Sequence, residues 1–380
     1  MHAKRTIIFA ISLLLLGAGG IWWRQENARK PGAQVHQQSV GGSIKKDLRA
    51  PSADPVARGE VLLQNKLPRD ESLGALQQMQ EELRALPADQ AVARIEEYLR
   101  TGKDRKTGLG FVIGAGGTMK EWPTLRTFLV DALLAIDAQA AARISREILA
   151  KPGSADEWAL ALRNLGRVET SADSRELLIE RTKELINNPE WQADPSIGYL
   201  NAFDTLVHTD ATETIPLLSG LIQRKDRKDL AHAGFLTLDR LVQRNPVDAL
   251  HLVAAERALS ASRPEMVAQQ FARADLRDTS QREIVRNWLL NPSRTPAELQ
   301  SFAGVYPNNN QFISHNLLSS STQSTGAELA AHDRAALEII TSWQKDAAFQ
   351  PVQEQLRTMV ARLNSFVGVS KLPIPAPPAK

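Results

Sequence analysis

Apolar residues recur at the spacing of an amphipathic α-helix along most of the chain, from about residue 56 to residue 368. Leu125, Leu129, Ala132 and Ile136, for example, stand at positions i, i+4, i+7 and i+11. This spacing places the apolar side chains on one face of a helix, where they can pack against a neighbouring helix. No stretch of strict alternation between turn signals reaches strand length. The pattern therefore predicts an all-α body.

Several helix starts are marked by serine or threonine followed three residues later by glutamate. In this capping box the hydroxyl and the carboxylate each bind a backbone N–H that the helix leaves unpaired. The motif occurs at Ser154–Glu157, Ser262–Glu265, Ser280–Glu283 and Thr295–Glu298, with a variant at Asp210–Glu213. Pro246 and Pro296 stand where the first helical residue is expected, a position that tolerates a missing N–H.

Three predicted helix ends can be aligned with one another: Leu162–Leu165, Phe203–Leu206 and Leu238–Leu241. In each, two large apolar residues stand three apart, and a polar turn and a second amphipathic helix follow. The final leucines are 41 and 35 residues apart. A helix pair that recurs every thirty to forty residues is typical of an α-solenoid built from antiparallel helix pairs.

Over roughly residues 120–290 the chain resembles the HEAT and armadillo class of helical repeats. The resemblance is one of architecture, and no consensus position recurs in every copy. The tetratricopeptide pattern fits less well, because Trp158 and the pair Leu165-Gly166 have the wrong spacing and the period is not a steady 34. A compact helical domain without repeats is the alternative to a solenoid.

The uncharged run Thr6–Trp23 predicts a membrane-spanning signal anchor. Its 18 residues would extend ~27 Å as a helix, close to the ~30 Å thickness of a hydrocarbon core. Lys4 and Arg5 precede the run and favour a cytoplasmic N-terminus, while two tryptophans at its end fit the opposite interface. Arg24 follows directly.

A cleaved signal peptide with a small-residue site at Gly17–Gly19 is the alternative. We favour the anchor because the apolar run continues through Ile21, Trp22 and Trp23. Both interpretations export the body of the protein; if the cell is Gram-negative, the body lies in the periplasm. We expect a single-pass inner (cell) membrane protein.

The expected organisation has five parts. Residues 1–5 form a cytoplasmic stub, residues 6–23 the transmembrane segment, and residues 24–55 a flexible linker. Residues 56–368 form the helical-repeat domain, and residues 369–380 a proline-rich tail with an extended conformation.

The amino-acid composition and charge exclude several kinds of chemical site and partner. The chain has 380 residues and no cysteine, which excludes disulfides, thiolate metal sites and a cysteine nucleophile. The net charge of +3 arises at the N-terminus: five basic residues and one acidic residue lie among the first 30, leaving 41 basic and 42 acidic residues in the rest. The body therefore lacks a field that would attract nucleic acid, and we expect no nucleic-acid partner.

The glycine-rich stretch Thr107–Thr118 resembles a phosphate-binding loop only superficially. Phe111–Ile113 can form a short strand, but Met119 stands where the dinucleotide fingerprint needs its last glycine, and Pro123 interrupts the helix that should follow. The Gly-Lys-Ser/Thr of a P-loop is absent. We predict an ordered loop that caps the first repeat.

We identify no catalytic, cofactor-binding or metal-binding residue in the sequence, and we expect no cofactor. None of the seven histidines lies in an H-E-x-x-H motif or a carboxylate cluster. His208 and Asp210 are interpreted as a helix-end cap, and the tryptophans as packing residues. Tyr306–Asn310 is the most turn-rich stretch of the body and a possible recognition loop.

These observations favour a membrane-anchored, exported helical-repeat scaffold that binds a protein partner, and they favour a binding protein over an enzyme. The alternative is an exported all-α enzyme acting on cell-wall glycan through two carboxylates. Two carboxylates facing one deep cleft would distinguish the enzyme from the scaffold.

Overall fold

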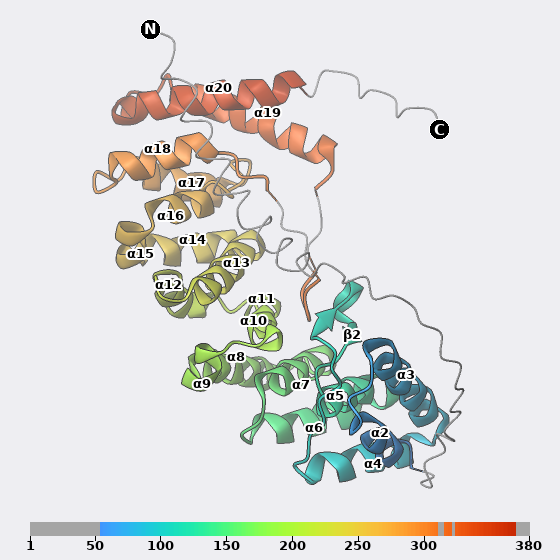
Figure 1. Cartoon of the computed structure of the whole chain (residues 1–380). Helices are drawn as coiled ribbons and strands as arrows, with labels where there is room; N and C mark the ends of the chain where they lie inside the picture. Colours follow the sequence, from blue (N-terminus) through green and yellow to red (C-terminus); the bar gives the residue numbers. More distant parts are fainter. Residues whose placement is uncertain (1–53, 311–314, 321–323, 370–380) are drawn as a thin grey trace, which may run out of the picture. The chain divides into compact units, whose positions relative to one another are not determined.

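The computed structural model describes residues 54–310, 315–320 and 324–369 (Figure 1). The predicted stub, the membrane segment, nearly all of the linker and the tail from residue 370 lie outside the described residues. Within these ranges no helix combines the length and the apolar character needed to cross a bilayer. The described chain is almost entirely helical, which confirms the all-α prediction.

Three helices precede a short hairpin: α2 (Pro55–Leu63), α3 (Arg69–Ala85) and α4 (Ala88–Arg100). The central helices are α5 (Leu125–Ile136), α6 (Ala138–Leu149), α7 (Ala155–Val168), α8 (Ala172–Asn187), α9 (Pro189–Ala193), α10 (Ile197–Ala202), α11 (Asp204–His208), α12 (Ile215–Ile222) and α13 (Lys228–Arg244). The later helices are α14 (Pro246–Ala255), α15 (Arg257–Ser262), α16 (Pro264–Phe271), α17 (Thr279–Leu289), α18 (Pro296–Val305), α19 (Gly326–Trp343) and α20 (Gln353–Val369). Short 3-10 helices occur at η1 (Ala115–Gly117), η2 (Thr212–Thr214) and η3 (Ala347–Val352).

Helices pack mainly on their neighbours in the chain. Helix α7 contacts α5, α6, α8 and α10, whereas α13 contacts α11, α12 and α14. Helix α16 contacts α14, α15 and α18, and α19 pairs with α20. This neighbour-to-neighbour packing is that of a helical-repeat protein.

The aligned helix ends contribute equivalent buried residues. Leu165, Leu206 and Leu241 are each 0% exposed, and all three belong to one continuous apolar core. The i, i+3 spacing of the alignment therefore marks the side of each helix that is covered by its neighbours.

Two predicted helix starts agree with the structure. Thr295 forms the full capping box with Glu298 at the start of α18, and the Ser154 side chain accepts a hydrogen bond from the Glu157 N–H at the start of α7. Pro246 and Pro296 occupy the first positions of α14 and α18.

Three predicted starts are wrong, each because another local interaction takes precedence. Ser262 ends α15 and donates its hydroxyl to the Ala258 carbonyl oxygen (2.7 Å). At α17 Asp278 is the cap, so that helix begins before Ser280. Asp210 has a positive φ of 51° and forms an ion pair with Arg244 instead of capping a helix.

The glycine-rich stretch forms an antiparallel hairpin between α4 and α5. Strand β1 (Val112–Ile113) pairs with β2 (Met119–Glu121), and η1 makes the connection. Of the stretch Phe111–Ile113, which can form a short strand, Val112 and Ile113 do so. Gly116 and Gly117 have φ values of 64° and 70°, the left-handed region that favours glycine.

Candidate functional site

Charged side chains are buried at the ends of the repeated helices. Arg163, Asp204 and Asp239 occupy the second position of the three aligned segments, and Arg273 follows 34 residues after Asp239. Their side chains are buried: Asp204 is 4% exposed and the Arg273 side chain 6%. We call these four residues the charged ladder. A buried charge is costly unless it is paired or hydrogen-bonded, so the partners of the ladder indicate what it does.

The first ladder residue, Arg163 on α7, holds the hairpin connection. Its guanidinium forms an ion pair with Asp131 (Nη2 to Oδ1, 2.6 Å) and donates to the Asn164 side-chain oxygen. A longer bond of 3.5 Å reaches the Gly117 carbonyl oxygen. Trp122 donates its indole N–H to the other Asp131 oxygen (2.8 Å). The hairpin is thereby fixed to α5 and α7.

The second ladder residue, Asp204, binds a segment 114 residues away in sequence. We call Asn316–Ser319 the docked segment. The Leu318 and Ser319 backbone N–H groups both donate to Asp204 Oδ2, at 2.7 and 2.8 Å, and the Ser319 hydroxyl donates to Oδ1. The Asn316 side-chain amide donates to Ser319 Oγ (3.2 Å), which closes a bend centred on the two leucines.

Arg167 and two glycines complete the contact with the docked segment. Arg167 Nη2 donates to the Leu317 carbonyl oxygen (3.1 Å) and to that of Gly116 (2.5 Å). A Cβ at Gly117 would lie 2.2 Å from the Leu317 oxygen, and a Cβ at Gly166 would lie 3.2 Å from Leu318 Cδ1. Larger residues at either glycine would therefore crowd the segment. In Figure 1 this short stretch lies beside the hairpin.

The last two ladder residues hold the turn-rich stretch that follows α18. Arg273 and Asp239 form a bidentate ion pair with both N–O distances at 2.9 Å. Arg273 Nη1 also donates to the backbone carbonyl oxygens of Asn308 (3.0 Å) and Asn310. The expected recognition loop at Tyr306–Asn310 is thus a stretch of non-helical chain bound by its main chain.

Two arginines, Arg240 and Arg244, interact electrostatically with Asp204. Burial lowers the pKa of Arg240, and the nearby Asp204 and Asp239 oppose this effect. The hydrogen bond to Asp210 raises the pKa of Arg244, and Asp204 contributes to the same effect. Arg240 and Arg244 thus interact electrostatically with the carboxylate that accepts three hydrogen bonds from the docked segment.

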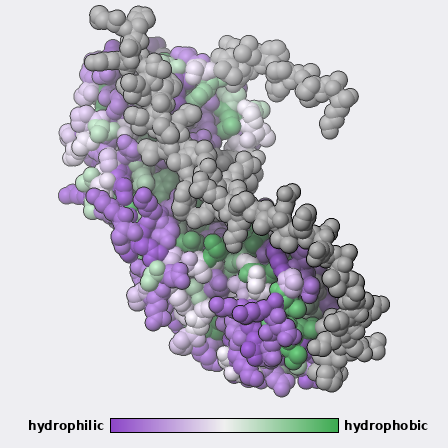
Figure 2. Space-filling model, in the orientation of Figure 1, coloured by the Kyte–Doolittle hydropathy of each residue, from purple (hydrophilic) through white to green (hydrophobic). Residues whose placement is uncertain are grey.

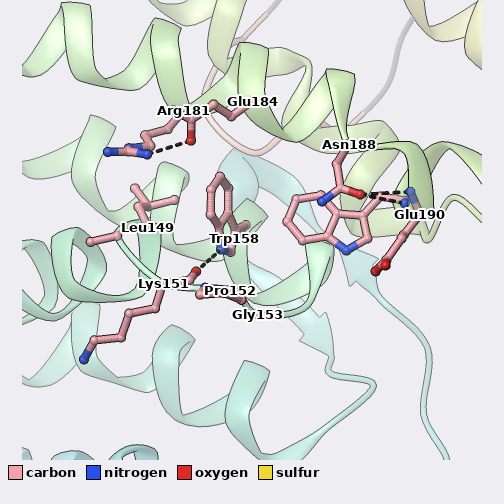
Figure 3. Close-up of a pocket in the computed structure, with 11 residues that line it drawn as sticks. Leu149, Lys151, Pro152, Gly153, Trp158, Arg181, Glu184, Asn188 and Glu190 are labelled. Carbon is pink, nitrogen blue, oxygen red and sulfur yellow. Dashed lines mark hydrogen bonds and ion pairs between the residues drawn. The ribbon is translucent and has the colours of Figure 1, made fainter.

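A separate pocket of about 370 Å³ lies between the α6–α7 loop, α8 and α9 (Figure 3). Trp158 donates its indole N–H to the Lys151 carbonyl oxygen (3.2 Å) and packs edge-on against Trp191, with the rings 5.3 Å apart. The two rings thus pack against each other between repeats, as expected of tryptophans that join helices.

Two carboxylates, those of Glu184 and Glu190, line this pocket. Glu184 forms an ion pair with Arg181 (2.6 Å), and Figure 3 shows Glu190 on the other side of Trp158. Across the described residues there is no group of three or more His, Asp or Glu side chains placed to hold a metal ion.

Other residues that the sequence singled out have different partners from those expected. His208 and Asp210 stand at the end of α11 as expected, but their side chains bind elsewhere: His208 Nε2 lies 3.1 Å from the Gly166 carbonyl oxygen, and Asp210 pairs with Arg244. In the glycine-rich loop the carbonyl oxygens of Gly116 and Gly117 face arginines, whereas a phosphate loop would present N–H groups. The loop therefore joins α7 to the docked segment instead of only capping the first repeat.

Sequence reasoning missed Asp204, Arg167 and the docked segment. A usable signal existed for Asp204, because a charged residue stands between the two large apolar residues of an otherwise buried helix end. No local pattern marks Asn316–Ser319 as its partner.

Comparison of the chain with protein-family models, with curated proteins and with solved structures gives no match. The function must therefore be inferred from the geometry of the charged ladder.

Proposed function

We propose that the protein is a membrane-anchored scaffold, exported to the far side of the membrane, whose helical-repeat domain binds a protein partner along the charged ladder. The anchor is Thr6–Trp23. The partner is expected to cross the ladder as non-helical chain, because the ladder binds main-chain groups.

One observation carries this proposal: the ladder already holds non-helical polypeptide at two places. Asp204 binds the N–H groups of Leu318 and Ser319, and Arg273 binds the carbonyl oxygens of Asn308 and Asn310. Such charge-assisted hydrogen bonds to backbone are stronger than neutral ones. Main-chain recognition with side-chain pockets is a recurring way of binding peptides.

The surface of the domain is compatible with such a role. On the face drawn in Figure 2, the residues that are not grey are mostly hydrophilic, with smaller hydrophobic areas among them. A polar surface of this kind leaves recognition to hydrogen-bonding groups such as those of the ladder.

Membrane fractionation tests the proposed anchor. After washing with high salt and with sodium carbonate, the full chain is expected to stay in the membrane fraction, because a span of ~18 apolar residues is not released by either treatment. Immunoblotting of the fractions checks this. A soluble protein whose mature N-terminus lies near Gly20 would instead support the cleaved signal peptide.

Site-specific photo-crosslinking in cells tests partner binding. A benzoylphenylalanine at His315, an exposed position next to the docked segment, is expected to give a crosslinked species larger than the chain itself. The matched control is the same residue at Glu180, an exposed position of α8 that pairs with Lys183. Equal crosslinking from both positions, or none from His315, would contradict binding at the ladder.

A further inference from the structure

We propose that the site around Asp204 recognises a Leu-Leu-Ser bend in the partner protein, and that the docked segment occupies this site as a built-in competitor. The inference rests on the scaffold function proposed above and names the chemistry of its partner. The recognition site consists of Asp204, Arg167, Gly117 and Gly166.

The polar part of the site selects a bend with a hydroxyl group. One carboxylate accepts two consecutive backbone N–H groups and the Ser319 hydroxyl. Consecutive N–H groups converge on one anion only where the backbone turns, as in the anion-binding nests of proteins. An alanine in place of the serine would leave one Asp204 oxygen without its hydroxyl donor.

The apolar part of the site selects the two residues before the hydroxyl. Leu317 is 1% exposed, and Leu318 lies against Gly166. Arg167 holds the carbonyl oxygen between them. His315 and Ser320, on either side, are exposed. The site therefore recognises two consecutive apolar residues followed by a residue with a hydroxyl group.

The docked segment competes because it belongs to the same chain. A tethered ligand acts at an effective concentration on the order of millimolar. Because of this high effective concentration, the docked segment leaves the site in only a small fraction of molecules. The apparent affinity for a free peptide is reduced by that fraction. A partner displaces the docked segment if it makes additional contacts elsewhere on the ladder, or if its own bend binds the site more tightly than the docked segment does.

A peptide-binding measurement on the full chain in detergent tests this. The probe is a fluorescein-labelled peptide of residues 315–320, His-Asn-Leu-Leu-Ser-Ser, followed by fluorescence anisotropy. The double variant Leu317→Ser/Leu318→Ser is expected to release the docked segment. It should bind the peptide at least tenfold more tightly than the unmodified chain does.

Variants of the site on this released background identify where the peptide binds. Asp204→Asn is expected to weaken binding at least tenfold, because it removes the charge and one acceptor. Asp210→Asn is the matched control: the Asp210 side chain is 44% exposed, its positive φ suits asparagine, and binding should not change. Gly166→Ala should weaken binding severalfold by crowding Leu318, whereas Gly220→Ala, whose Cβ meets nothing within 4 Å, should not.

A purely structural role for the docked segment predicts different results. In that case the folded double variant does not bind the peptide at millimolar concentration, or binding is unaffected by Asp204→Asn, and either result overturns the proposal. If circular dichroism shows that the double variant has lost its helices, the single variant Ser319→Ala decides. This variant should bind the peptide severalfold more tightly than the unmodified chain does. An unchanged affinity would also overturn the proposal. Crosslinking from position 315 with no peptide binding would leave the scaffold function standing and remove only this inference.

Discussion

The Leu241→Ala protein is expected to lose about 2–5 kcal/mol of unfolding free energy, the range measured for leucine truncation in well-packed cores. Leu241 is 0% exposed and lies in α13, which packs on α11, α12 and α14. The lost contacts and the cavity left behind both contribute. Chemical denaturation followed by circular dichroism measures the change. Ile197→Ala is the control, because Ile197 is 52% exposed and should cost less than about 1 kcal/mol.

The damage should also be local. In a helical-repeat protein each unit contacts mainly its neighbours, so stability is close to a sum of local contributions. Hydrogen exchange in the Leu241→Ala protein should therefore rise in α11–α14 while α19 and α20 remain protected. The same pattern, centred on α11, is expected for Leu206→Ala. Uniform loss of protection under conditions in which the unmodified chain stays folded would indicate one cooperative core.

Arg273→Ala is expected to destabilise the protein by about 3–5 kcal/mol, because it leaves Asp239 as a buried carboxylate without its cation. The side chains of the pair are only 6% and 2% exposed. The substitution also removes the donor to the Asn308 and Asn310 carbonyl oxygens. Thermal and denaturant unfolding measure the loss.

The pair Arg244–Asp210 supplies a matched control for this prediction. It joins the same residue types across the same 34-residue separation, but its side chains are 41% and 44% exposed. Arg244→Ala should therefore cost about 0–1 kcal/mol. The double variant Arg273→Met/Asp239→Leu should recover most of the stability lost in Arg273→Ala, since apolar replacement of both partners removes the unpaired charge. Equal losses for Arg273→Ala and Arg244→Ala would contradict a burial-dependent role of the ladder.

Local interactions explain how much of the fold could be predicted. The cap at Thr295 requires only the hydroxyl, Glu298 and the N–H groups between them, so four residues of sequence specify it. The buried faces were likewise predictable, because helical periodicity alone places Leu206 and Leu241 toward a neighbour. The wrong starts at Ser262, Ser280 and Asp210 arose where two local interactions compete and the motif does not show which is stronger.

The sequence by itself determined the helical class of this protein and the apolar side of the repeated helices, because each depends on neighbours in the chain. Only the tertiary structure decided what the buried charges bind. Asp204 accepts hydrogen bonds from residues 114 and 115 positions away, and Arg167 donates to a carbonyl 150 residues away. The packing of the repeats determines these partners, because it brings backbone groups that are distant in sequence next to a buried charge. A buried charge requires such partners.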